Sequence, residues 1–151
     1  MKRHPSLQDL SREHHMLLTH ARELRWSSEG HGDLAKACKE FLKYWNERGL
    51  RHFELEERKL FPFCERRDHW HGAEEIGMVY EQHEEIRKYT SDLEEKIKKE
   101  GDLQKGVSEL ARLLEKHVRY EERIVFEMIQ KSLTEDELLE LRDYLSVPRD
   151  E

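Results

Sequence analysis

Two segments of the sequence carry histidine and glutamate at a spacing that suits metal binding. Residues 52–61 and 117–126 both begin with His, have Glu at the fifth and sixth positions and Arg at the seventh, and end with Phe. In a helix, side chains four residues apart project from the same face, with Cβ atoms about 6 Å apart. Each segment is therefore predicted to chelate metal. The two chelating pairs are His52 with Glu56 and His117 with Glu121.

A further histidine precedes each segment on an apolar helical stripe. His14 is followed three residues later by Leu17, and His83 is followed three residues later by Ile86. His15 is the neighbouring alternative to His14, but the spacing of the flanking leucines favours His14. Two equivalent halves thus supply imidazoles and carboxylates, which suit first-row transition metals. The six candidate ligands are His14, His52, Glu56, His83, His117 and Glu121.

The evidence for a metal site comes from the number of these residues and not from any single one. A single His on an apolar face is more often a core residue than a metal ligand. Buried together without a metal, however, several imidazoles and carboxylates would carry a severe desolvation cost. Glu57 and Glu122 point about 100° away from the preceding glutamates. We predict that they are surface groups or hydrogen-bond partners of the ligands, with exchange into the ligand set as an alternative.

Other catalytic and metal-binding motifs are missing from the sequence. No His has Glu three residues before it, as the Glu-x-x-His motif of ferritin-like di-iron proteins requires. The His-Glu-x-x-His motif of zinc proteases and the glycine-rich phosphate loop are also absent. We therefore assign no catalytic residue and leave open whether the protein is an enzyme.

The candidate ligands fall in four long segments with helical periodicity, and a short fifth segment follows. Breaks in the pattern occur at 27–32, 66–72, 101–102 and 132–134. Ser6, Asp33, Asp102 and Thr134 suit helix N-termini, and Pro62 is expected to end or kink the second helix. The predicted fold class is all-α, an up-down-up-down antiparallel four-helix bundle with a short fifth C-terminal helix.

The helical spacing also predicts which residues face inward. Tyr80 on the third helix and Ile124 and Met128 on the fourth are expected on buried stripes. At about 1.5 Å per residue, His83 and His117 lie at nearly the same level of the bundle. The first connection fits less well, because the second helix must overhang, or its loop must climb by about two turns, ~10 Å, to bring His52 level with His14.

Composition and charge restrict the class of protein. The length of 151 residues predicts one domain, with a helical core at about 7–130 and a C-terminal helix at about 135–145. The net charge of −7 disfavours nucleic acid as a partner. Two cysteines, no signal peptide and no apolar run of about 20 residues predict a cytoplasmic protein without a membrane span. The fifth helix packs across one end of the bundle or docks on a second copy, so a homodimer stays open.

At the paired His-x-x-x-Glu motifs the chain resembles the hemerythrin family, in particular the hemerythrin-like or HHE cation-binding domains. The resemblance covers roughly residues 7–130. It implies two iron ions in an oxo- or hydroxo-bridged di-iron centre, also bridged by the two glutamates and able to bind dioxygen, nitric oxide or peroxide. The six candidate ligands match the family's ligand positions.

Arg87 departs from the pattern of the oxygen-carrying hemerythrins. They have a further His one turn after the third-helix His, and in this chain that position is Arg87. Arginine stays protonated and cannot ligate a metal. The resemblance then implies open coordination positions on both irons, which favours sensing or small-molecule chemistry over reversible oxygen carriage. Arg87 could instead hydrogen-bond a bound anion or pair with Glu57.

These observations predict a non-haem di-iron protein that binds dioxygen or nitric oxide for sensing, storage or scavenging. One alternative is a di-iron enzyme that acts on peroxide or nitric oxide or serves iron-sulfur repair. Another is a bundle with a structural zinc or other redox-silent metal. The expected partner is a small diatomic ligand or peroxide, with no nucleic acid and no membrane.

Overall fold

The structure is a computed structural model that describes residues 1–147. Within this range the secondary structure is entirely helical, which confirms the predicted all-α class. Five-residue π-helical turns, denoted η, separate some of the α-helices. The elements in order are α1 (Pro5–Ser28), α2 (Leu34–Tyr44), η1 (Trp45–Gly49), α3 (Leu50–Leu55), η2 (Glu56–Leu60), α4 (Phe61–Glu65), α5 (Ala73–Lys98), α6 (Gln104–Tyr120), η3 (Glu121–Val125), α7 (Phe126–Ser132) and α8 (Glu135–Ser146).

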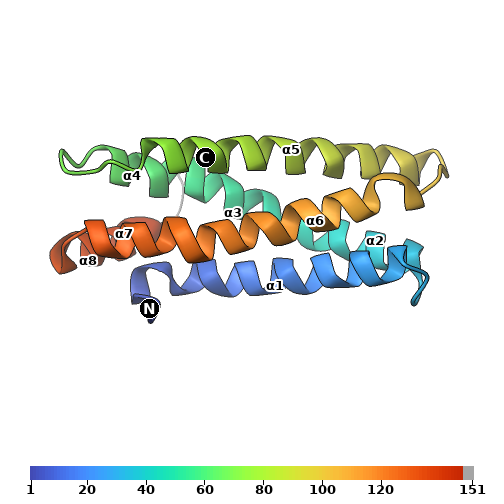
Figure 1. Cartoon of the computed structure of the whole chain (residues 1–151), viewed down its shortest axis with the longest axis horizontal. Coiled ribbons are helices and arrows are strands. Elements are labelled where there is room, and N and C mark those ends of the chain that lie inside the picture. The colour runs from blue at the N-terminus through green and yellow to red at the C-terminus, as the bar shows by residue number, and fades with distance from the viewer. Residues whose placement is uncertain (148–151) are drawn as a thin grey trace.

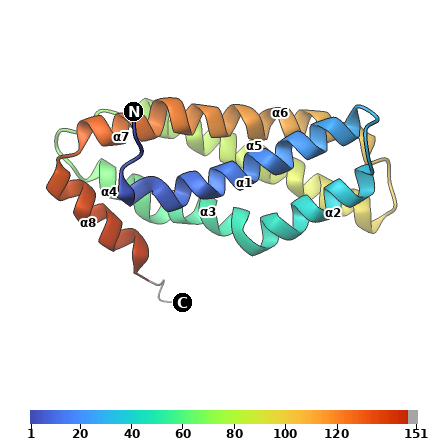
Figure 2. The ribbon, with the colours of Figure 1, turned by 90° about the horizontal axis from the view of Figure 1, so that it is seen from below.

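Four long segments lie lengthwise beside one another (Figure 1). They are α1, the run from α2 to α4, α5, and the run from α6 to α7. α6 packs against both α1 and α5, and α1 also packs against α2. α8 packs against α1 and η2 and extends away from one end of the bundle (Figure 2). Among the described residues, no helix is long and apolar enough to cross a membrane.

The helix starts agree with the sequence at two predicted caps and differ at the other two, since α6 has Leu103 at its cap instead of Asp102 and α1 starts before Ser6. Asp33 accepts a hydrogen bond from the Lys36 N–H, and Thr134 forms a reciprocal capping box with Glu137. α1 begins two residues earlier than predicted from Ser6. Its cap is His4, whose Nδ1 accepts from the Ser6 N–H at 3.0 Å. Pro5 occupies the first turn, where a missing N–H leaves no helical bond unmade.

Two of the π-helical turns begin at candidate ligands. η2 starts at Glu56 and η3 starts at Glu121, and each closes with a hydrogen bond that spans five residues instead of four. Such a turn inserts one residue into an α-helix and is frequent at functional sites. Because one residue corresponds to about 100° of helical rotation, everything after the turn changes face relative to an uninterrupted α-helix.

This rotation explains where the predicted stripe on the fourth segment was wrong. Ile124 is 44 % exposed and Met128 is only partly buried, whereas Val125 and Ile129 are fully buried. The prediction assumed a constant 3.6-residue period through Glu121. The wide turn shifts the buried positions by one residue along the chain.

Of the two outcomes expected at Pro62, an end or a kink, the structure excludes an end of the second segment. The helix continues through α4 to Glu65, and Pro62 stands in the first turn of α4, directly after η2. A proline is tolerated there because the first residues of a helix need no backbone donor. The π-helical turn therefore provides a position that the proline can occupy.

The apolar core consists of two clusters with a polar layer between them. One cluster includes Leu17, Phe41 and Leu114, and the other includes Leu10, Phe61 and Ile129. His14 lies on α1 between Leu10 and Leu17, at the junction of the two clusters. The candidate ligands thus occupy the middle of the bundle, with apolar packing on both sides.

Candidate metal centre

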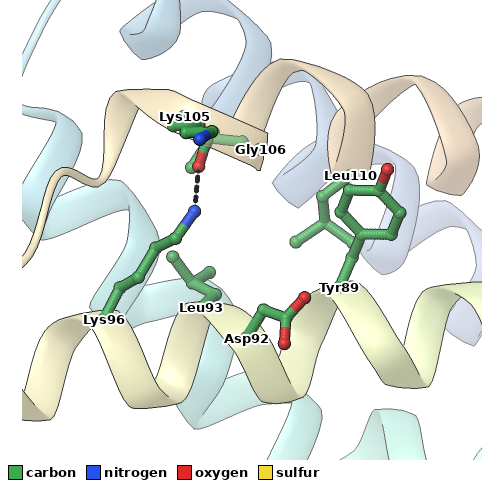
Figure 3. Close-up of a pocket in the computed structure, with 8 residues that line it drawn as sticks. Tyr89, Asp92, Leu93, Lys96, Lys105, Gly106 and Leu110 are labelled. Carbon is green, nitrogen blue, oxygen red and sulfur yellow. Dashed lines mark hydrogen bonds between the residues drawn. The ribbon is translucent and has the colours of Figure 1, made fainter.

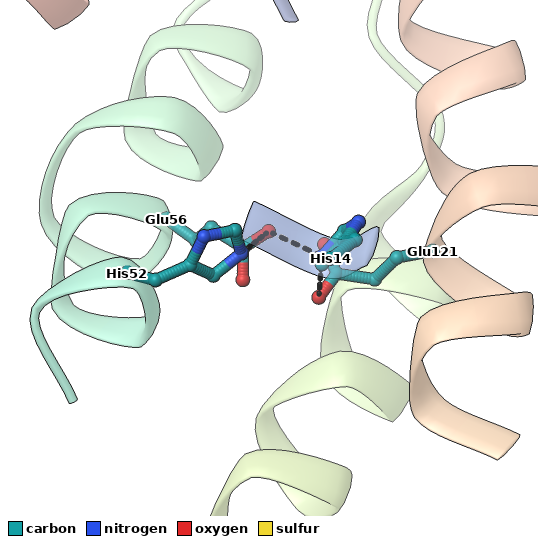
Figure 4. A group of neighbouring side chains, drawn as sticks. All are labelled: His14, His52, Glu56 and Glu121. Atoms are coloured by element: carbon teal, nitrogen blue, oxygen red, sulfur yellow. Dashed lines mark ion pairs between the residues drawn. The ribbon is translucent and has the colours of Figure 1, made fainter. Parts of the chain in front are cut away.

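All six predicted ligands are buried and lie together in this polar layer. The most exposed of them, His52, shows only 3 % of its surface. The six side chains form two groups that could each hold a metal ion, with ligand atoms within 4.8 Å of one another. Figure 4 shows the first group, in which His14 and Glu121 approach His52 and Glu56 from other helices. The groups are His14, His52, Glu56 and Glu121, and Glu56, His83, His117 and Glu121.

The Nε2 atoms of the histidines face the carboxylates of the two shared glutamates. His83 Nε2 lies 3.1 Å from Glu56 Oε1, and His117 Nε2 lies 2.6 Å from Glu121 Oε1. On the other side, His52 Nε2 lies 3.4 Å from Glu56 Oε2 and His14 Nε2 lies 3.6 Å from Glu121 Oε1. Both glutamates therefore stand between the two histidine pairs.

His14 and His52 meet although their segments were expected to place them at different levels of the bundle. The rings of His14 and His52 have centroids 4.7 Å apart. Figure 2 shows that the second segment changes direction between α2 and α3, where η1 lies. His15 is exposed, whereas His14 is 1 % exposed and lies in the cluster.

Each of the four histidines is held from outside the cluster through its Nδ1 atom. The Nδ1–H groups donate to acceptors at 2.6–3.1 Å, which leaves each Nε2 atom facing the cluster. Such outer contacts fix the ring orientation and the tautomer of metal-binding histidines. The pairs are His14 with Glu122, His52 with Glu13, His83 with Glu57, and His117 with Gln82.

Two of these outer acceptors were anticipated and two were missed. Glu57 and Glu122 act as hydrogen-bond partners of ligands, one of the alternatives that the sequence left open. Glu13 and Gln82 were not singled out. Both occupy the same place in the internal repeat, immediately before His14 and His83, and this correspondence is the signal that could have identified them.

Arg87 forms a two-point contact with Glu57. Its Nη1 and Nη2 atoms donate to the two carboxylate oxygens of Glu57, each at 2.9 Å. Burial raises the pKa of Glu57, but the hydrogen bonds from His83 and Arg87 outweigh this effect and bring the pKa to about 2. Of the two roles considered for Arg87, the structure shows the pairing with Glu57. Tyr80 is 38 % exposed instead of inward-facing, and its hydroxyl donates to the Glu57 carbonyl at 3.2 Å.

The buried cluster holds groups of opposite charge. Burial lowers the pKa of His14, but the carboxylates of Glu121, Glu122 and Glu56 outweigh it and raise the pKa to about 10. The pKa of His83 rises to about 10 in the same way, with burial opposed by the nearby carboxylates of Glu121, Glu56 and Glu57. For His117, burial prevails and its pKa is lowered.

A metal ion fits the atoms that the fold leaves without partners. The Nε2 atoms of all four histidines and both carboxylate oxygens of Glu56 and Glu121 are buried, and none makes a hydrogen bond. Buried polar atoms without partners are costly, and the short contacts between them lack hydrogen-bond geometry. Imidazole nitrogen and carboxylate oxygen are ligands that first-row transition metals accept. The six residues therefore form a donor set that a pair of cations would satisfy.

The cavities elsewhere in the described chain offer weaker candidates. A cavity of about 50 Å³ lies between α5 and the start of α6, where Lys96 donates to the Lys105 carbonyl at 2.6 Å (Figure 3). It contains no histidine or cysteine. A groove of about 810 Å³ runs beside α1, η1 and α8, and one of its lining residues is Glu13, the partner of His52. This groove is the only one of the described pockets that reaches a residue in contact with the cluster.

Comparison with known families gives one match. The family model described as "Hemerythrin HHE cation binding domain" matches residues 6–129, a range that contains all six candidate ligands. No curated protein and no solved structure matches the chain.

Proposed function

Because the chain belongs to the hemerythrin HHE cation binding domain family, we propose that its buried cluster binds two iron ions. His14 and His52 would hold one ion, and His83 and His117 would hold the other. Glu56 and Glu121 belong to both donor groups, so they would contact both ions. This sharing of two carboxylates by two histidine pairs is the observation that carries the proposal.

We further propose that the protein binds dioxygen or nitric oxide for sensing, storage or scavenging. A bound iron pair would supply redox chemistry and coordination positions for a diatomic ligand or peroxide. The protein offers no seventh ligand where oxygen-carrying hemerythrins have one, since Arg87 stands there and is tied to Glu57 by two hydrogen bonds. This arrangement supports open positions at the centre.

The residues around the cluster restrict the access of water. Phe53 stacks on His83 with ring centroids 3.7 Å apart, and Phe126 stacks on His14 at 5.1 Å. The two apolar clusters close the bundle above and below the ligands.

As part of the same proposal, the segments follow the up-down-up-down antiparallel order predicted from their short connections. The buried free thiols of Cys38 and Cys64 favour the reducing cytoplasm.

Metal analysis combined with spectroscopy tests this function. Protein purified from iron-supplied cells should contain about two irons per chain, and its near-ultraviolet absorption should change on reduction and on exposure to dioxygen or nitric oxide. The variant His14→Ala should lose iron, whereas His15→Ala, which changes the exposed neighbour, should retain it. Zinc in place of iron, without any redox-dependent spectrum, would support a structural metal instead.

Turnover assays separate the binding protein from the enzyme. Iron-loaded protein should bind nitric oxide or dioxygen stoichiometrically without consuming peroxide or nitric oxide over many cycles. Multiple turnovers that His14→Ala abolishes and His15→Ala preserves would favour the di-iron enzyme.

A further inference from the structure

The outer acceptors of the four histidines follow the internal repeat. Glu13 and Gln82 each precede the first His of their half, and each accepts from the second His of the same half. Glu57 and Glu122 each follow a ligand glutamate, and each accepts from the first His of the opposite half. The supporting contacts of the two metal positions are therefore related by the same pseudo-symmetry as the ligands.

One substitution breaks this symmetry. Where the first half has the carboxylate of Glu13, the second half has the neutral amide of Gln82. His52 Nδ1 lies 3.1 Å from Glu13 Oε1, and His117 Nδ1 lies 2.8 Å from Gln82 Oε1. The geometry of the two contacts is thus alike, and their charge differs by one unit.

The arginines next to the other two acceptors do not restore the balance. Arg87 holds both oxygens of Glu57 at 2.9 Å on the side of His83. On the side of His14, Arg3 Nη2 approaches one oxygen of Glu122 at 3.2 Å, and Ser11 donates its hydroxyl to the same carboxylate. Each carboxylate therefore has one arginine partner, so these two contacts are balanced in charge.

The unbalanced carboxylate is Glu13. Arg48 and Arg51 lie near enough to act on it through space, but neither forms an ion pair with it among the described residues. At the matching place beside His117, Gln82 is buried and brings no charge. His52 consequently has a carboxylate charge within hydrogen-bonding distance of its Nδ1 atom, and His117 does not.

We infer that the two metal positions prefer ions of different charge, with a trivalent cation bound by His14 and His52 and a divalent cation bound by His83 and His117. A carboxylate that accepts from a ligating imidazole makes that imidazole more basic and stabilises positive charge on the metal. Glu13 and Gln82 are the residues that set this preference, and they act through His52 and His117. The inference rests on the proposed binding of two ions, but it does not require that either ion is iron.

Redox-silent ions test the preference without any activity measurement. Metal-free full-length protein is supplied with equal amounts of Zn²⁺ and of Ga³⁺, the latter as its nitrilotriacetate complex, and crystallised. Anomalous diffraction at the gallium and zinc edges then locates each element. We expect gallium between His14 and His52 and zinc between His83 and His117. Equal mixing of the two elements, or the reverse order, would overturn the inference.

A matched pair of isosteric variants assigns the effect to the outer acceptors. Glu13→Gln should lower the affinity for Ga³⁺ at the His14–His52 position about 10–100-fold, as loss of an outer partner commonly does. Gln82→Glu should raise gallium occupancy at the His83–His117 position. The double variant should exchange the two elements, and an unchanged distribution in it would count against the inference.

The outcomes also separate this inference from the proposed function. If two ions bind but their distribution is the same in the wild type and in the double variant Glu13→Gln/Gln82→Glu, only the inferred difference between the two positions is overturned. A wild-type chain that binds no pair of ions would overturn both, and the same chain with Zn²⁺ alone would show that result independently.

Discussion

His14 and His83 hold protons that a metal ion must displace. With both pKa values raised to about 10 in the metal-free cluster, these imidazoles are protonated at pH 7, and ligation needs their neutral form. Metal binding at pH 7 should therefore release at least these two protons. Because fewer protons remain to be displaced as the pH rises towards 10, affinity should rise with pH.

Calorimetric titration in buffers of different ionisation enthalpy measures this release. The observed heat of Zn²⁺ binding should depend linearly on the buffer's ionisation enthalpy, with a slope that falls as the pH approaches 10. Heats that are the same in every buffer at pH 7 would show that the two imidazoles are already neutral.

The residue pattern predicted that the six candidate ligands lie together in the core better than it predicted their hydrogen-bond partners. Regular spacing and the internal repeat distinguished His14 from its exposed neighbour His15, because burial follows helical periodicity. Glu13 lies about 100° around the same helix from His14, so no rule based on one helix directs it to His52. Its contact arises from the packing of α1 against the second segment.

At the level of the helices, the π-helical turns determine which residues are buried in the segments that follow the ligand glutamates. After Glu121, the buried residues Val125, Phe126 and Ile129 stand four, five and eight positions on. An α-helix would bury positions three, four and seven. Removing one residue from the turn would therefore let the downstream core fit a regular α-helix.

Deletion of Arg123 tests what the turn contributes. The side chain is exposed, so helix content should be retained, while loss of the wide turn that starts at Glu121 should change the directions of the Glu121 and Glu122 side chains relative to their partners. We expect metal affinity to fall about 10–100-fold, the range seen when the support of a ligand is lost. Circular dichroism and metal titration measure the two effects, with Arg123→Ala as the control that retains the turn. Unchanged affinity in the deletion variant would show that the turn does not place the glutamates.

The cap of α8 makes this helix sensitive to acid. The pKa of Glu137 is lowered, first by the hydrogen bond from the Thr134 backbone N–H and further by His69. A carboxyl whose pKa is lowered in the folded state stabilises it above the unfolded value, here 4.5, and that contribution is lost as the pH falls through the folded value. α8 should therefore open more readily below about pH 4.5.

Amide hydrogen exchange in α8 checks this expectation. Protection should fall between pH 5 and pH 3 relative to α5, after correction for the intrinsic exchange rate, and Glu137→Gln should flatten the change. Thr134→Ala should weaken α8 at every pH, by about 1 kcal/mol. A pH profile that is the same in wild type and in Glu137→Gln would exclude the carboxyl as the cause.

The helix boundaries were predictable to the extent that they depend on local chemistry. Asp33 and Thr134 cap helices as their side chains predict, because these contacts reach only three residues ahead. The π-helical turns were not predictable from a 3.6-residue period. In the sequence they appear only as a shift of one residue between the apolar positions before the turn and those after it. The course of the chain through Pro62 depends on such a turn.

For the molecule as a whole, the polar layer divides the core into two apolar clusters. Long segments with few breakers were enough to predict the all-helical class, because each segment has one apolar face to bury. The layer itself is a weak point of the metal-free bundle, since it contains buried atoms without hydrogen-bond partners. A ligand that binds only the folded state should therefore stabilise the whole molecule.

Removal of metal should lower the melting temperature by an amount that linkage predicts. At a free metal concentration about 100 times the Kd, binding adds about 2.7 kcal/mol to the free energy of unfolding. For a chain of this size about 1 kcal/mol corresponds to roughly 2–4 °C, so a chelator should lower the melting temperature by roughly 5–11 °C. His14→Ala should already melt at a reduced temperature and respond little to the chelator. His15→Ala should respond as the wild type does. Equal melting temperatures with and without chelator, in wild-type protein shown to contain metal beforehand, would mean that the bundle does not depend on its polar layer being filled.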